Sequence, residues 1–99
     1  MTDRLSGLSP PIRKGARSMK VQRNRVLEAA RDARNCSRAM LAMICNTTEE
    51  SCRRYERGTP LTHNCCSIPN VFTALKIAAA LDCDVATLFN AKAYTWEEV

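Results

Sequence analysis

The sequence predicts an all-α fold in which five short helices surround one small core. Its 99 residues suit a single domain of that size. Hydrophobic residues make up 45% of the chain and aromatic residues only 5%, so Ala, Leu, Val and Met must fill the core, which is typical of helical proteins. Apolar residues recur at helical spacing in several stretches, and no alternating strand pattern is visible.

Capping residues mark the expected ends of the first three helices. Asn35 suits the left-handed residue that ends the first helix. Ser37 is a good N-cap for a second, short helix. Thr47 or Thr48 can cap a third helix over about 49–57, which a glycine then ends.

Two more helices are expected after a polar loop over 59–68. Pro69-Asn70 opens a fourth helix over 71–81, and Asp84 caps a fifth that runs through Phe89. The core-facing stripe expected for the fourth helix consists of Val71, Ala74, Leu75, Ala78 and Leu81.

The net charge of +5 is concentrated near the N-terminus. Residues 1–25 carry seven Lys/Arg and one Asp, a net charge of +6, whereas the rest of the chain is close to neutral. A basic arm on a near-neutral domain favours a polyanionic partner, most often nucleic acid, with a solubilising tail as the alternative. Because residues 1–24 lack periodic apolar positions, we expect a flexible arm there, followed by a domain over 25–90 and a tail over 91–99.

The chain contains no segment expected to enter or cross a membrane. No apolar run approaches the roughly 20 residues that span a bilayer. The basic N-terminus lacks the apolar stretch of a secretory signal, so a cytoplasmic location and no membrane partner are expected.

The second and third expected helices are both about two turns long and meet through Cys45-Asn46-Thr47, as in a helix-turn-helix. Three segments contribute to this pattern: 35–42 (Asn-Cys-Ser-Arg-Ala-Met-Leu-Ala), 46–58 (ending Tyr-Glu-Arg-Gly) and 69–89. In their order and spacing, these three segments resemble the lambda-repressor/Cro-type (XRE-like) helix-turn-helix family over about two thirds of the chain.

The resemblance implies a five-helix lambda-repressor-like domain and a repressor-like, sequence-specific transcription regulator. Such a protein binds double-stranded DNA as a homodimer and places the helix around 48–57 in the major groove. It also implies an ion pair between Arg31 and Glu56 and a dimer interface on and after the fifth helix. The expected base contacts are Glu49, Glu50, Arg53 and Arg54; the expected backbone contacts are Arg38, Thr47, Thr48 and, on the arm, Arg13, Lys14, Arg17, Lys20 and Arg23; the dimer candidates are Leu88, Phe89, Tyr94 and Trp96.

Two departures from the family pattern leave a second function open. Glu49 and Glu50 place carboxylates where the helix would approach phosphates, and the loop over 59–68 is longer than the family's usual connection. The alternative is a protein-interaction module on the same scaffold, with weak or no DNA binding. An enzyme is not expected, because no nucleophile–base set, phosphate-binding loop or paired-carboxylate cleft is present in the sequence.

The six cysteines do not follow the pattern of a metal site or a disulfide scaffold. Cys36, Cys45, Cys52 and Cys83 are similar in position to apolar residues of the family, and free cysteine behaves as a small hydrophobe. No cofactor or metal is therefore expected. The adjacent pair Cys65-Cys66, near His63 in the loop, has no assigned role.

Overall fold

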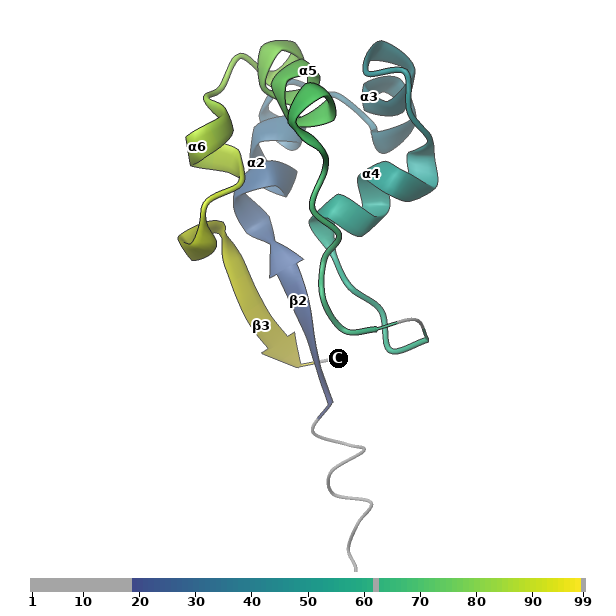
Figure 1. Cartoon of the computed structure of the whole chain (residues 1–99), viewed down its shortest axis with the longest axis vertical. Coiled ribbons are helices and arrows are strands. Elements are labelled where there is room, and N and C mark those ends of the chain that lie inside the picture. Colours follow the sequence, from purple (N-terminus) through teal and green to yellow (C-terminus); the bar gives the residue numbers. More distant parts are fainter. Residues whose placement is uncertain (1–18, 62, 99) are drawn as a thin grey trace, which may run out of the picture.

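The computed structural model describes residues 19–61 and 63–98. Helices gather at one end of the domain, and a pair of strands extends from the other (Figure 1). The elements of the described residues, in chain order, are β2 (Lys20–Asn24), α2 (Arg25–Ala33), α3 (Arg38–Ile44), α4 (Glu49–Glu56), α5 (Val71–Leu81), α6 (Val85–Leu88), the 3₁₀ helix η1 (Ala91–Ala93) and β3 (Tyr94–Glu98).

The expected all-α fold is wrong, because β2 and β3 form an antiparallel sheet. Lys20 lies opposite Glu98, and Asn24 lies opposite Tyr94. Part of the expected flexible arm and part of the expected tail therefore pair with each other. The pairing joins opposite ends of the described chain, so no local sequence pattern predicts it. The available signal was the run Tyr94-Thr95-Trp96, whose residue types favour strands.

The helices begin and end close to the expected residues. The Ser37 side chain accepts a hydrogen bond from Met40 N, and Thr48 accepts one from Ser51 N. Asn35 and Asn46 both adopt left-handed backbone conformations, with φ of 52° and 56°. Local capping chemistry therefore accounts for the starts of α3 and α4. Asp84 stands at the N-cap position of α6 as expected, but its side chain makes no capping hydrogen bond.

Asn24 joins the sheet to the helices. It is the last residue of β2 and the N-cap of α2, where its Oδ1 accepts a hydrogen bond of 2.9 Å from Leu27 N. Its Nδ2 donates a 2.7 Å hydrogen bond to the carbonyl oxygen of Leu88, in α6. The side chain is buried, so both bonds are shielded from water.

The long loop after α4 lies along the second edge of β2. Gln22 N donates to Asn64 O at 2.8 Å, and Gly58 N donates to Gln22 O at 2.9 Å. A Cβ atom at residue 58 would lie 2.2 Å from Asn64 O, so only glycine allows this approach. The loop is thus held against the sheet by backbone hydrogen bonds.

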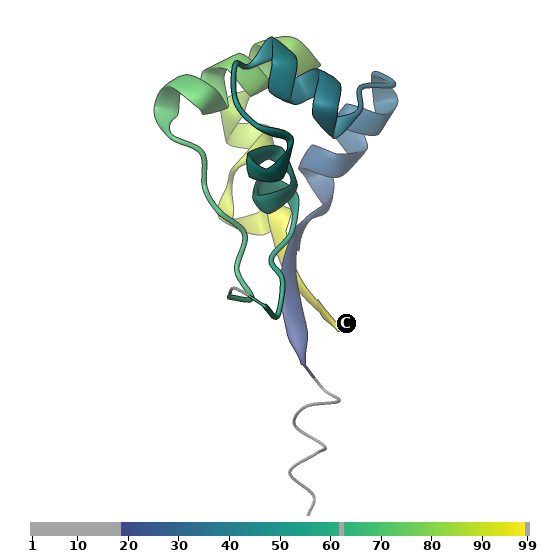
Figure 2. The same ribbon diagram turned by 90° about the vertical axis from the view of Figure 1, so that its right-hand side faces the viewer.

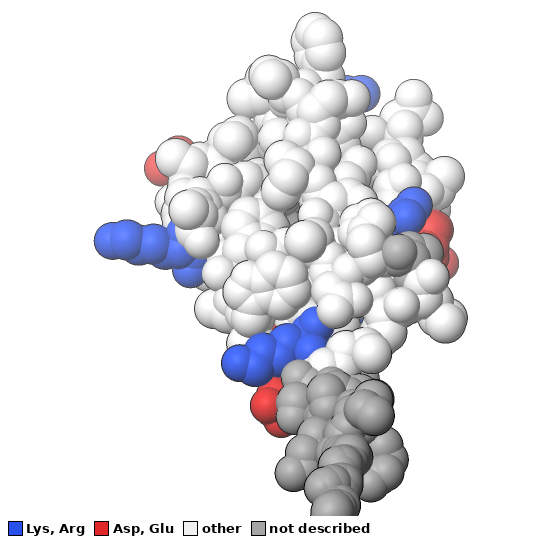
Figure 3. All heavy atoms as spheres, turned by 60° about the horizontal axis from the view of Figure 1, so that its bottom comes forward, with Lys and Arg blue, Asp and Glu red and all other residues white. Residues whose placement is uncertain are grey.

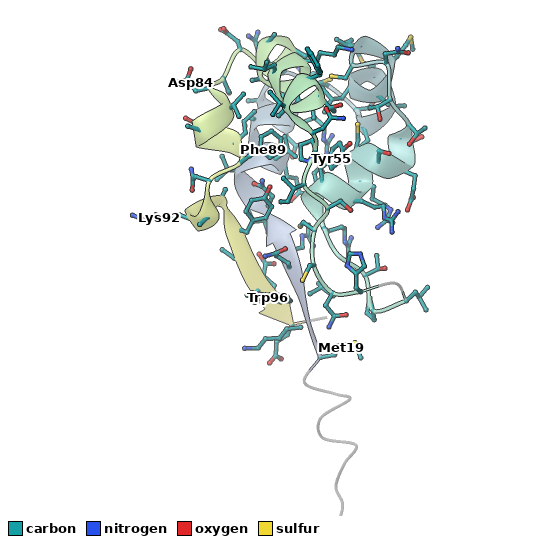
Figure 4. All side chains as sticks on the ribbon, in the orientation of Figure 1. Met19, Tyr55, Asp84, Phe89, Lys92 and Trp96 are labelled. Carbon is teal, nitrogen blue, oxygen red and sulfur yellow. The ribbon has the colours of Figure 1, made fainter. Side chains whose placement is uncertain are left out.

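The core lies between the five α-helices of the described residues and contains three thiols. Tyr55 and Phe89 pack against it from its edge, and both lie toward the centre of the molecule in Figure 4. Cys83 also packs against it. The buried core residues are Leu27, Cys36, Leu41, Ala42, Cys45, Cys52, Ile77, Ala78, Leu81 and Leu88.

The buried face of α5 differs from the expected stripe. Ala74, Ala78 and Leu81 are buried as expected, and Ile77 is buried as well. Val71 and Leu75 are instead 73% and 53% exposed. Because almost every residue of α5 is apolar, the 3.6-residue period could not decide which side faces the core.

We expect Asn24→Ala to lower the free energy of unfolding by about 2–4 kcal/mol. The change removes an N-cap and leaves the buried Leu88 carbonyl without its donor. Urea denaturation followed by circular dichroism measures the loss. Asn70→Ala is the matched control, since Asn70 caps α5 in an exposed position and should cost only about 1 kcal/mol. Equal losses in the two variants would contradict the joining role of Asn24.

We expect the ion pair between Arg25 and Glu97 to make stability depend on acid pH. Arg25 Nε lies 2.9 Å from Glu97 Oε2, and the hydrogen bonds from Arg25 lower the pKa of Glu97 from 4.5 to about 2. A lowered folded pKa means that the contribution is present above pH 4.5 and is lost as pH falls toward 2. Urea midpoints measured across this window should therefore fall less steeply for Glu97→Gln than for the wild-type chain. Parallel pH profiles would contradict the assignment.

Candidate nucleic-acid interface

Helices α3 and α4 form a compact two-helix unit joined by a tight turn. Figure 2 shows α3 lying above α4, with α4 seen almost end-on. Thr47 N donates to Ala42 O at 2.9 Å, and the left-handed Asn46 turns the chain between the helices. Ala42 and Cys52 are both buried in the core that the two helices share. The arrangement is that of a helix-turn-helix, with α4 as its second helix.

A buried carboxylate fixes the C-terminal end of α4. Glu56 is 2% exposed, and its Oε2 accepts a 2.6 Å hydrogen bond from Arg31 Nε, in α2. Its Oε1 accepts a 3.0 Å hydrogen bond from Arg38 Nε, in α3. The hydrogen bond that Arg31 donates to Glu56 raises the pKa of Arg31, so this guanidinium stays charged. The structure thus contains the ion pair expected between Arg31 and Glu56 and adds a second arginine to it.

Arg38 is oriented by this cluster, which the sequence did not reveal. Its guanidinium bonds inward to Glu56, although its side chain remains 28% exposed. Arg31 Nη1 also lies 3.6 Å from Asp32 Oδ1, so two carboxylates face the two arginines of this cluster. Arg38 could also contact a phosphate through the edge that faces solvent.

The first turn of α4 is exposed and acidic. Glu49 and Glu50 are exposed, and Arg53 donates to Glu50 Oε1 at 3.0 Å from one turn further along the helix. This hydrogen bond lowers the pKa of Glu50. These three side chains and Arg38 line one surface hollow of about 280 Å³. Four of the predicted contact residues are thus brought together.

Arg54 does not line that hollow, and its guanidinium is not neutralised by a carboxylate of the described residues. Its side chain is half-buried, and its guanidinium has no hydrogen-bond or ion-pair partner among the described residues. Its carbonyl accepts a 2.8 Å bond from Ser67 N, which ties the segment after the loop to α4. Thr47 is half-buried in the turn, and Thr48 is exposed as the cap of α4.

The predicted arm residues fall partly in the sheet. Arg13, Lys14 and Arg17 lie outside the described residues. Lys20 is exposed at the start of β2. Arg23 is instead paired with Glu28 at 3.1 Å and is mostly shielded, so it is not free to reach phosphates as expected.

The predicted dimer residues differ widely in exposure. Leu88 is 0% exposed, so it belongs to the core of its own chain and offers no surface to a partner. Phe89 and Tyr94 are half-buried, and Phe89 packs against the core. Trp96 is 51% exposed on β3 and lies at the margin of the molecule in Figure 4.

The cysteines do not form a metal-binding cluster in the part of the chain that the structure describes. No group of three or more His, Cys, Asp or Glu side chains there could hold an ion. Burial raises the pKa of the Cys52 and Cys66 thiols to about 11, so both remain protonated. Cys65 and His63 are exposed in the loop.

An apolar pocket between α5 and α6 was not anticipated. It has a volume of about 240 Å³ and is bordered by exposed residues of α5. The available signal was the absence of any charged residue from 58 to 75. Its lining consists of Ile68, Pro69, Val71, Ala74, Leu75, Val85 and Phe89.

Comparison with protein-family models, with curated protein sequences and with solved structures finds no match. No helix among residues 19–61 and 63–98 is both long and apolar enough to cross a membrane.

We expect Glu56→Gln to lower the free energy of unfolding by about 3 kcal/mol, because the change leaves Arg31 and Arg38 without their carboxylate. Urea denaturation measures the loss. Glu50→Gln is the matched control: Glu50 also pairs with an arginine, but at an exposed site, and its removal should leave the urea midpoint unchanged. A Glu56→Gln variant as stable as the wild-type chain would rule out the orienting role of the cluster.

Proposed function

We propose that this chain is a sequence-specific, repressor-like transcription regulator that inserts α4 into the major groove of double-stranded DNA. The observation that carries the proposal is the α3–α4 unit. The first turn of α4 is exposed to a ligand, while its last residue, Glu56, is anchored to α2 and α3. A recognition helix needs this combination, because base contacts require a helix held in a defined orientation.

Arg54 is the residue we assign to a guanine. Its guanidinium, which has no partner among residues 19–61 and 63–98, can donate two hydrogen bonds to O6 and N7, the commonest specific contact in the major groove. Glu49, which has no arginine partner among the described residues, can accept from a cytosine amino group. Arg53 and Glu50 would act as a pair, since neither can contact a base without changing the bond between them.

Backbone contacts would come from the edges of the α3–α4 unit. Arg38, Thr47 and Thr48 lie at the starts of α3 and α4, where donors can reach phosphate oxygens. The basic residues of the arm, including the exposed Lys20, would add contacts that do not depend on sequence. These contacts would orient the chain on DNA without selecting a site.

We further propose that the protein acts as a homodimer in the cytoplasm and has no catalytic role. Each α4 is short, and two copies on adjacent half-sites would enlarge the base-contacting surface. All six cysteines are free, as suits a reducing compartment.

A protein-interaction module is the second candidate, and the acidic first turn of α4 favours it. Glu49 and Glu50 would repel phosphates but attract a basic protein surface. Met40, Met43 and Ile44 are exposed on α3 and could support such a contact.

The test is a selection of DNA duplexes from a random pool by the full chain, followed by binding measurements on the selected duplex. We expect enrichment of a common sequence. Arg54→Ala should reduce the preference for that sequence by about 1–3 kcal/mol, read by fluorescence anisotropy as about a 5- to 150-fold loss. The double change Glu49→Gln and Glu50→Gln should raise affinity for unrelated DNA, because it removes two charges that repel phosphates.

Arg34→Ala is the control for loss of a positive charge. Arg34 is the C-cap residue of α2, pairs with Asp82 after α5, and is not one of the assigned contacts. It should therefore keep the sequence preference. A pool that shows no enrichment at low and at moderate salt would contradict DNA recognition and favour the protein-interaction module. Equal losses for Arg34→Ala and Arg54→Ala would remove Arg54 from base readout.

A further inference from the structure

The exposed side of α5 carries a continuous run of large apolar side chains. We call Ile68, Val71, Phe72 and Leu75 the α5 patch. Phe72 is 77% exposed and Ile68 64%, and Val71 is exposed to a similar extent. Single apolar residues on a surface are ordinary, but a cluster of this kind marks a surface that another molecule covers.

The α5 patch lies beside the apolar pocket and partly forms it. Val71 and Leu75 line the pocket from α5, and Val85 and Phe89 line it from the α6 side. Apolar cavities of roughly 150 Å³ are known to hold benzene, so a pocket of about 240 Å³ can accept a phenyl ring. The patch therefore offers both a protruding aromatic side chain, Phe72, and a pocket that fits one.

Charged residues stand only at the edges of this surface. None occurs from 58 to 75. In the view of Figure 3, most of the Lys, Arg, Asp and Glu side chains that can be seen lie toward the margins of the molecule. The charged residues nearest in sequence are Lys76, one turn beyond Phe72 on α5, and Asp84, directly before Val85. Neither has an ion-pair partner among the described residues.

We propose that the α5 patch is the interface between two copies of this chain, with Phe72 of each copy seated in the pocket of the other. A projection and its complementary pocket on the same surface are what an isologous, two-fold contact requires. Residues four apart share a helix face, so Lys76 follows Phe72 toward the other copy. It then approaches Asp84 at the border of the pocket, where each charge gains the partner it lacks.

This interface specifies the homodimer of the proposed function, but it does not require DNA. It shares Phe89, which lines the pocket, with the surface expected from the sequence. It does not include Leu88, which is buried, or Trp96, which lies on β3. A face without charges also allows two basic chains to meet without repulsion between their interfaces.

The test is sedimentation of the full chain over a range of concentrations, without DNA and with a reductant because Cys65 is exposed. We expect a dimer. Phe72→Asp should weaken dimerisation at least about 30-fold, as for a central aromatic side chain of an interface. Trp96→Ser is the matched control, an exposed aromatic residue outside the patch, and should leave the dissociation constant unchanged. Thermal unfolding verifies that each variant is folded.

A charge exchange tests the geometry independently. Lys76→Asp and Asp84→Lys should each weaken the dimer, and the double variant should recover most of the loss, because the opposite charges then meet again. A wild-type monomer at all concentrations, a Phe72→Asp dimer of unchanged affinity, or a dimer lost only in Trp96→Ser would overturn the interface. Failure of the double variant to recover would overturn the proposed contact of Lys76 with Asp84. None of these outcomes depends on DNA recognition by α4, which the duplex selection tests separately.

Discussion

The buried carboxylate of Glu56 is the constraint on which the orientation of α4 depends. It belongs to the last residue of α4 and accepts hydrogen bonds from an arginine of α2 and an arginine of α3. A buried carboxylate without these donors is strongly unfavourable, so the three helices pack in the arrangement that supplies both. Such a cluster adds little net stability compared with an apolar core, but it selects one geometry among several that the small apolar side chains would allow.

Hydrogen bonds connect the sheet to the helices and loop around this cluster. Asn24 connects β2 to α2 and α6, and the loop after α4 is bound to the far edge of β2 by backbone hydrogen bonds. After this loop, Ser67 N donates a hydrogen bond to the carbonyl oxygen of Arg54, in α4. The exposed first turn of α4 therefore stands on a well-bonded support: among the described residues, Arg57 Nε and Tyr94 OH are the only buried side-chain nitrogen or oxygen atoms without a hydrogen-bond partner.

Features decided by neighbouring residues could be predicted from the sequence. The caps Ser37 and Thr48 and the left-handed Asn46 act within one turn, so they located the helices closely. The strands were missed because Lys20 and Glu98 pair across the whole described chain. At the candidate site, sequence patterns identified the charged residues but not their partners: whether Arg38 turns toward Glu56 or toward solvent is decided by tertiary packing.

The antiparallel pairing of β2 with β3 has a mechanical consequence. Lys20 and Glu98 are opposite each other, so the first residue of β2 and the last residue of β3 lie at the same end of the sheet. A force that separates those two positions acts across the strands and breaks their hydrogen bonds one pair at a time, which requires far less tension than sliding all of them at once. The β2–β3 pairs would separate in order from Lys20–Glu98 to Asn24–Tyr94, and the force would reach the helices only after the last pair had opened.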